Sequence, residues 1–210
     1  MNYNYVGRIR DEILPLWPEQ CARVLEIGCG AGATLAYLKR MELCSWTAGI
    51  ELHHETASHA RSHVDLLLEG NIEQLDLPFE PGSFDVVLCL DVLEHLIDPW
   101  QVLKNIKGLL TQKGVIIASI PNIRHASIVL PLLLQGRWEY SESGLLDRTH
   151  LRFFTRSTSV KLFESSGYRV DHVLSTGTER GRPGWLPNLL TLSIFKPLLE
   201  LQYLIRAQPA

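Results

Sequence analysis

The chain has 210 residues, of which 46% are hydrophobic and 20% charged. This length and apolar content predict one compact domain with a sizeable core, and exclude a disordered chain or a disulfide-stapled miniprotein. The net charge of −3 provides no basic surplus for a phosphate backbone, so no nucleic-acid partner is expected. Since the sequence has no apolar leader and no run of eighteen apolar residues, we also expect no signal peptide and no membrane span.

The cysteines and the β-rich runs indicate an α/β protein of a reducing compartment. The four cysteines contain no Cys-x-x-Cys pair, which predicts free thiols and a cytoplasmic location. Seven short β-rich runs alternate with helical patterns, as a parallel sheet with crossover helices requires. The expected strands are residues 23–27, 46–51, 64–69, 84–90, 115–120, 168–174 and 201–207, and the expected helices are 33–40, 55–63, 99–110 and 155–164.

Two long connections interrupt this alternation. Residues 122–154 form a loop-rich insert before the last expected helix, and connections of this length are usually lids or binding segments. Residues 177–197 form a second insert, which begins polar and glycine-rich and becomes apolar from Leu189 to Phe195. We expect this apolar stripe to be a core or interface element rather than a membrane anchor. The predicted organisation is a single domain, residues 1–210, carrying both inserts.

A glycine-rich loop follows the first expected strand. Gly28, Gly30 and Ala33 fit the pattern G-x-G-x-x-G/A, and Glu51 ends the second strand, where an acid could bind ribose hydroxyls. These residues alone allow a dinucleotide site of a nicotinamide-dependent oxidoreductase. Glu26 argues against that interpretation, because a carboxylate would repel a pyrophosphate and attract a cationic amino-acid group.

The segment Val24-Leu25-Glu26-Ile27-Gly28-Cys29-Gly30-Ala31-Gly32 resembles motif I of the class I S-adenosylmethionine-dependent methyltransferases. Further motifs follow in the order of that family, and the resemblance covers residues 20–121. They are Gly49-Ile50-Glu51, Gly70-Asn71-Ile72-Glu73, residues 84–96 and residues 109–115. The resemblance implies a Rossmann-like α/β fold with a seven-stranded mixed sheet in the order 3-2-1-4-5-7-6, an antiparallel last strand, and helices on both faces. It also implies S-adenosyl-L-methionine as the cofactor.

The same resemblance assigns a cofactor role to ten residues. The backbone of Gly28, Cys29 and Gly30 would pass under the methionine moiety, with Glu26 close to that end. Glu51 would bind both ribose hydroxyls. The remaining members are Leu52 beside Glu51, Asn71 and Ile72 at the adenine, and Leu90 and Asp91 at the sulfonium side. Asn71 stands where the family more often has aspartate, so its role is less well defined.

The first insert also resembles a branch of this family. Its segments Pro121-Asn122-Ile123-Arg124-His125 and Asp147-Arg148-Thr149-His150-Leu151-Arg152-Phe153-Phe154-Thr155 are similar to methyltransferases associated with glycosyltransferases of surface-polysaccharide synthesis. This implies O-methylation of a saccharide or another small-molecule hydroxyl. We expect His150 to be the general base, with Asp147 or His125 orienting it or the acceptor.

Several alternatives stay open at this level. Arg148 or Arg152 could bind an anionic part of the substrate, or both could form an ion-pair network with Asp147. Small-amine N-methylation, an oxidoreductase, a cofactor-binding protein without catalysis, and a homodimer also remain. The cluster of His53, His54, His59 and His63 is best explained as a solvated helix face, so no metal site is predicted.

Overall fold

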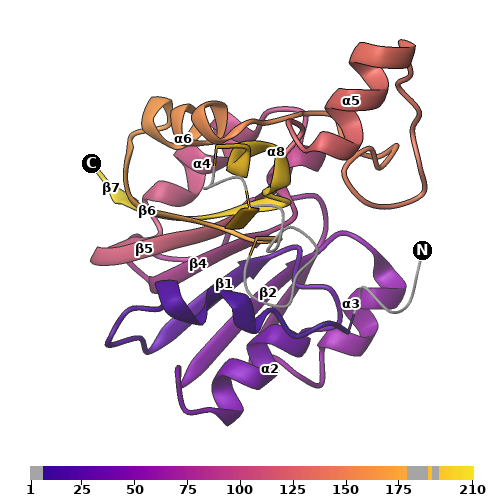
Figure 1. Cartoon of the computed structure of the whole chain (residues 1–210). Coiled ribbons are helices and arrows are strands. Elements are labelled where there is room, and N and C mark those ends of the chain that lie inside the picture. Colours follow the sequence, from indigo (N-terminus) through magenta and orange to yellow (C-terminus); the bar gives the residue numbers. More distant parts are fainter. Residues whose placement is uncertain (1–6, 179–188, 191–193) are drawn as a thin grey trace.

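The computed structural model describes residues 7–178, 189–190 and 194–210, and these form one seven-stranded sheet (Figure 1). The strands are β1 (Arg23–Ile27), β2 (Trp46–Glu51), β3 (Leu66–Glu69), β4 (Phe84–Leu90), β5 (Leu110–Pro121), β6 (Tyr168–Ser175) and β7 (Gln202–Pro209). Their order is β3-β2-β1-β4-β5-β7-β6. The first five strands pair in parallel, whereas β7 is antiparallel to both β5 and β6. The predicted fold class and strand order are confirmed.

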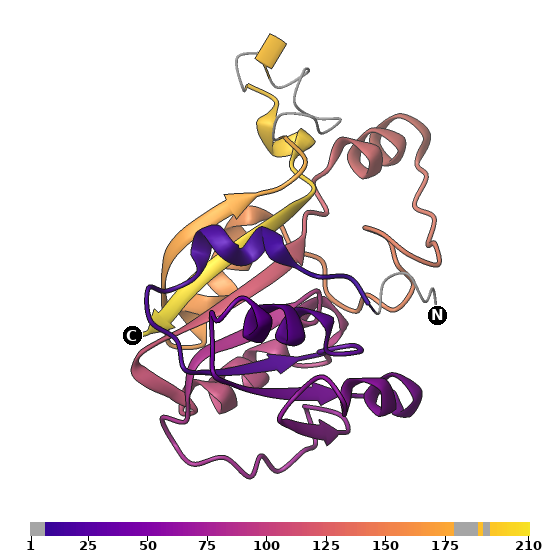
Figure 2. The same ribbon diagram turned by 90° about the horizontal axis from the view of Figure 1, so that it is seen from below.

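Helices cover both faces of the sheet. They are the 3-10 helices η1 (Asp11–Leu16) and η2 (Leu93–His95), and the α-helices α2 (Ala33–Arg40), α3 (His54–Ala60), α4 (Pro99–Lys107), α5 (Ala126–Gln135), α6 (Arg156–Ser165) and α8 (Lys196–Leu199). In Figure 1, α2 and α3 lie on one face, and α4 and α6 lie on the other. Figure 2 shows η1 crossing the face formed by β5 and β7.

The central strands divide the apolar side chains between two cores. In β4, Val87 and Cys89 belong to the core under α4 and α6, whereas Val86 and Leu88 belong to the core under η1 and α2. Strands that are buried on both faces need apolar residues at almost every position. This burial explains why their sequence is continuously apolar rather than alternating.

Several element predictions were wrong in detail. Helix α4 ends at Lys107 rather than at residue 110, and β3 begins at Leu66 rather than at residue 64. The first insert is not only loop, because it contains the helix α5. This helix is apolar on all sides and has no buried residue, so its sequence lacks the one-sided apolar pattern that identifies a packed helix. Strand β5 begins at Leu110 rather than at residue 115. The polar residues 111–113 hide this start in the sequence, although Leu110 pairs with Phe84. Helix α3 ends at Ala60 rather than at residue 63.

The second insert is described only in part, because residues 179–188 and 191–193 lie outside the described residues. Of the apolar stripe, Leu189, Leu190, Ile194 and Phe195 are all more than half exposed. These four side chains are therefore not core residues. None of the helices that the structure describes has the length and apolar character needed to cross a membrane.

Candidate active site

The glycine loop connects β1 to α2 at the carboxyl edge of the parallel strands. The backbone N–H groups of Gly28 and Cys29 both donate to the Ile50 carbonyl, at 2.8 and 3.1 Å, which holds the loop against the end of β2. Gly28 has φ +69°, and a Cβ added there would come 2.5 Å from Cγ2 of Val92. Only glycine fits this position, because any side chain would meet both unfavourable φ and an occupied space.

Glu26 is a buried carboxyl beneath this loop. It is 3% exposed, and its Oε2 has no hydrogen-bond partner. Burial raises the pKa of Glu26 to about 8, against a smaller opposing effect of the nearby Arg10 charge. A buried carboxyl without a partner is costly unless a cation or donor approaches it. This site therefore favours a positively charged ligand group.

Glu51 and Asn71 lie at the ends of neighbouring strands. The Glu51 carboxylate accepts from the backbone N–H of Gly30 at 3.0 Å and from that of His53 at 2.9 Å, so both oxygens are held at the edge of the loop. Leu52 beside it is 56% exposed. The Asn71 Oδ1 accepts from the Glu73 N–H at 3.0 Å, which uses part of its acceptor capacity within its own turn. Ile72 packs against the core with its side chain partly buried.

Asp91 is the centre of a buried network at the end of β4. Arg10 donates to Asp91 Oδ2 at 2.8 Å and to Ser119 Oγ at 3.1 Å. The other carboxylate oxygen of Asp91 accepts from Ser119 Oγ at 2.6 Å and from Gln202 Nε2 at 2.7 Å. Leu90, just before it, is buried. The network fixes Asp91, which has φ +57°, and ties the segment before η1 and the strands β5 and β7 to the site.

A second group of side chains lies just beyond Asp91. Glu94 is 1% exposed, and neither of its carboxylate oxygens has a hydrogen-bond partner. Burial, and then the Asp91 charge, raise the pKa of Glu94 well above its ordinary value. The rings of His95 and His150 meet edge to face, with centroids 4.7 Å apart. Burial, followed by the neighbouring His95, lowers the pKa of His150.

The first insert is tied to this group by its backbone. The carbonyl of Glu94 accepts from the N–H groups of Leu151 and Arg152 at 2.8 and 2.9 Å. Thr149 donates to Asp147 Oδ1 from both its backbone N–H, at 2.8 Å, and its hydroxyl, at 2.6 Å. The predicted residues Asp147 and His150 are thus brought to one place, next to the end of β4.

The other predicted residues of the insert have different surroundings. His125 caps α5, where its Nδ1 accepts from the Ser127 N–H at 3.3 Å. No hydrogen bond or ring contact joins His125 to Asp147 or His150 within the part of the chain that the structure describes. Arg148 pairs with Glu142 at 2.6 Å, and Arg152 donates to the Ile97 carbonyl. The described residues therefore show no ion-pair network of the two arginines with Asp147.

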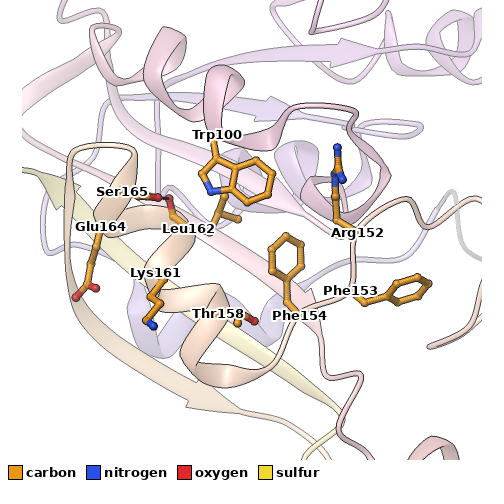
Figure 3. Close-up of a pocket in the computed structure, with 9 residues that line it drawn as sticks. All are labelled: Trp100, Arg152, Phe153, Phe154, Thr158, Lys161, Leu162, Glu164 and Ser165. Atoms are coloured by element: carbon orange, nitrogen blue, oxygen red, sulfur yellow. Dashed lines mark hydrogen bonds between the residues drawn. The ribbon is translucent and has the colours of Figure 1, made fainter.

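A separate pocket of about 540 Å³ lies between α4 and α6. Figure 3 shows Trp100, Phe154 and Leu162 facing into it, while Phe153 points away. It contains none of the predicted cofactor or catalytic residues. The candidate site is instead the carboxyl edge of β1, β2 and β4, together with residues 147–151, which are held beside the end of β4 through the Glu94 carbonyl.

Sequence reasoning missed Arg10, Ser119 and Gln202. It allowed Glu94 and His95 to form an exposed helix start, whereas Glu94 is 1% exposed. The first three could not be found, because they come together only through the sheet order. An acid and a histidine directly after the end of β4 were a usable signal, since polar residues at this edge of a parallel sheet commonly bind ligands.

These residues fit S-adenosylmethionine. The unpartnered Oε2 of Glu26 suits the cationic amino group of the methionine moiety, and the glycine loop leaves room for close backbone approach. The Glu51 carboxylate is fixed at the end of β2, where it can accept from two adjacent hydroxyls.

Comparisons with known proteins agree with this fit. Residues 1–173 match a family model described as a methyltransferase domain. The chain is 29% identical over 171 residues to the ubiquinone biosynthesis O-methyltransferase of Albidiferax ferrireducens, covering 74% of this chain and 66% of that protein. It is 30% identical over 162 residues to the protein of the same name from Xanthomonas campestris, covering 70% and 65%. The matches thus span just under two thirds of these relatives.

Solved structures show the same fold. A methyltransferase from Archaeoglobus fulgidus gives a TM-score of 0.67 at 18% identity, covering 94% of this chain and 90% of that one. An S-adenosylmethionine-dependent methyltransferase from Mesorhizobium loti gives 0.65 at 15% identity, covering 93% and 95%.

Proposed function

The chain belongs to the methyltransferase-domain family, with S-adenosylmethionine as its cofactor, and we propose that it methylates a hydroxyl oxygen of a small molecule. The observation that carries the proposal is the group of His95, His150 and Asp147 beside the end of β4. Methyl transfer to a hydroxyl requires loss of the hydroxyl proton. A buried imidazole with a lowered pKa is neutral near pH 7, so its lone pair can accept that proton directly or bind a cation that acidifies the hydroxyl.

The relatives support the same acceptor chemistry. The two that were compared above are named O-methyltransferases of ubiquinone biosynthesis. When bound, S-adenosylmethionine supplies an electrophilic methyl group, and the residues of this chain must orient the acceptor and exclude water. The tether between Glu94 and residues 151–152 holds the first insert over the strand ends, which suits both tasks.

The saccharide acceptor that the sequence predicts is one candidate within this class, and a phenolic acceptor is another. An acceptor screen with labelled cofactor separates them from small amines. We expect label in a hydroxyl-bearing product and none in the amine pool. Label confined to amines would contradict the proposal. Binding of a nicotinamide cofactor in place of S-adenosylhomocysteine would contradict it as well.

A further inference from the structure

Glu94, His95 and His150 form a cluster with the donor set of a metal site. One ligand atom from each residue lies within 4.8 Å of the others. A carboxylate oxygen and two imidazole nitrogens are the ligands of catalytic zinc sites and of two-histidine, one-carboxylate iron sites, both of which keep coordination positions open for substrate.

The buried carboxylate of Glu94 needs a partner that the described residues do not supply. Both of its oxygens are buried and without a hydrogen bond, although the two imidazoles are close. A carboxylate buried in this way is stabilised by ion pairing or by metal coordination. An ion at the centre of a triangle with sides of 4.8 Å would lie about 2.8 Å from each corner, so side-chain shifts of roughly 0.7 Å would give ordinary coordination distances.

The histidines are oriented as metal ligands usually are. The Nδ1 of His150 faces the Leu145 carbonyl at 3.3 Å, and that of His95 faces the Thr149 carbonyl at 3.3 Å. A carbonyl only accepts hydrogen bonds, so a neutral ring places its proton on Nδ1 and leaves the Nε2 lone pair available. The Thr149 hydroxyl, 3.1 Å from His95 Nδ1, donates onward to Asp147, which completes a second layer of support.

The backbone holds these ligands in place before any ion arrives. Glu94 and His95 belong to η2, and His150 lies in the insert, yet the Glu94 carbonyl binds the N–H groups of Leu151 and Arg152. This tether fixes the distance between two segments that are more than fifty residues apart. Because the backbone is already held, less conformational entropy is lost when an ion binds.

We propose that Glu94, His95 and His150 bind a divalent transition-metal ion, which in turn binds the acceptor hydroxyl. The role of the ion rests on the proposed function, but its binding does not. A bound cation lowers the pKa of a coordinated hydroxyl, so the proton passes to water. The oxygen then bonds to the methyl carbon as the sulfur–carbon bond breaks, and sulfur keeps the electron pair of that bond. His150 acts here as a ligand and not as a base, because Nε2 is its one available lone pair. This proposal departs from the sequence analysis, which predicted no metal site.

The test is titration of tag-free, metal-free protein with Co²⁺, followed by its visible absorption, and with Zn²⁺ and Mg²⁺ by calorimetry. We expect one Co²⁺ or Zn²⁺ per chain and weaker Mg²⁺ binding, since imidazole ligands favour the former. Glu94→Gln and His150→Ala should each weaken Co²⁺ binding by at least about 100-fold, and Thr149→Val by about 10-fold. His59→Ala, which removes an exposed histidine of α3, should leave it unchanged.

Each variant is also tested for S-adenosylhomocysteine binding, which reports a folded donor site. His95→Ala replaces any variant that fails this check. Absence of saturable Co²⁺ or Zn²⁺ binding, or equal binding by the Glu94→Gln, His150→Ala and wild-type proteins, would overturn the metal site. Metal binding without methylation of any hydroxyl would instead contradict the proposed function and leave the metal site standing.

Discussion

Replacing the buried Glu26 with glutamine separates the effect of this carboxyl on the free energy of unfolding from its contribution to cofactor binding. The pKa of Glu26 is about 8 in the folded protein, against an ordinary value of 4.5, because burial disfavours the charged form. Between these pH values the folded state keeps a proton that the unfolded chain has released, so the free energy of unfolding decreases as pH rises. At about 1.4 kcal/mol per pKa unit, the cost is about 3 kcal/mol at pH 7 and approaches 5 kcal/mol above pH 8.

The assay is urea unfolding of the ligand-free wild-type and Glu26→Gln proteins from pH 5 to 8.5. We expect the two to agree within about 1 kcal/mol at pH 5, and the variant to be more stable by about 3 kcal/mol at pH 7. Glu55→Gln, which changes an exposed carboxyl of α3, serves as the control and should track the wild type at every pH. A difference between Glu26→Gln and wild type that does not vary with pH would refute the reasoning.

The same variant should bind cofactor less well although it is more stable. A cationic amino group next to Glu26 lowers its pKa, so binding near pH 7 releases a proton from the wild-type protein. Loss of this charged contact should weaken S-adenosylhomocysteine binding by about 10- to 100-fold. Calorimetry in two buffers of different ionisation enthalpy measures both the affinity and the proton release. Equal affinity and equal proton release in the two proteins would show that Glu26 does not contact the ligand.

Three further changes test the loop and its surroundings. Gly28→Ala should destabilise the protein by about 2–3 kcal/mol more than Gly82→Ala in urea unfolding, because both have φ +69° but only the first would meet neighbouring atoms within 4 Å; equal losses would contradict this. Arg10→Ala should cost about 3–5 kcal/mol, since it removes an ion-pair partner of the buried Asp91, and a loss below 1 kcal/mol would contradict that pairing. Glu51→Gln should weaken S-adenosylhomocysteine binding about tenfold by calorimetry, because an amide NH₂ takes the place of one of the two carboxylate oxygens that accept from backbone N–H groups. Unchanged affinity would argue against a role of Glu51 in cofactor binding.

The strands could be predicted because double burial leaves a direct record in the sequence. Each residue of Val86-Val87-Leu88-Cys89-Leu90 faces one of two cores, so the whole run is apolar. Helix α6 could also be predicted, because Thr155 caps its start with its side chain and Gly167, with φ +86°, follows its end. Helix α5 was not predicted although His125 caps its start and Gly136, with φ +61°, follows its end, because its apolar residues are not confined to one side and none of them is buried.

Site residues could be predicted only where they lie within recognisable sequence motifs. Motif order predicted the glycine loop, Glu51 and Asp91 as cofactor residues. The partners of Asp91 are Arg10, which precedes η1, and residues of β5 and β7, and only the fold brings these together. Glu94 and His150 likewise meet only because the backbone of the insert returns to η2. Two carboxyls of this site, Glu26 and Glu94, have buried oxygens without a partner. Buried unpaired carboxyls destabilise the fold, so both are consistent with the two proposals made above, a cationic amino group bound at Glu26 and a metal ion bound at Glu94.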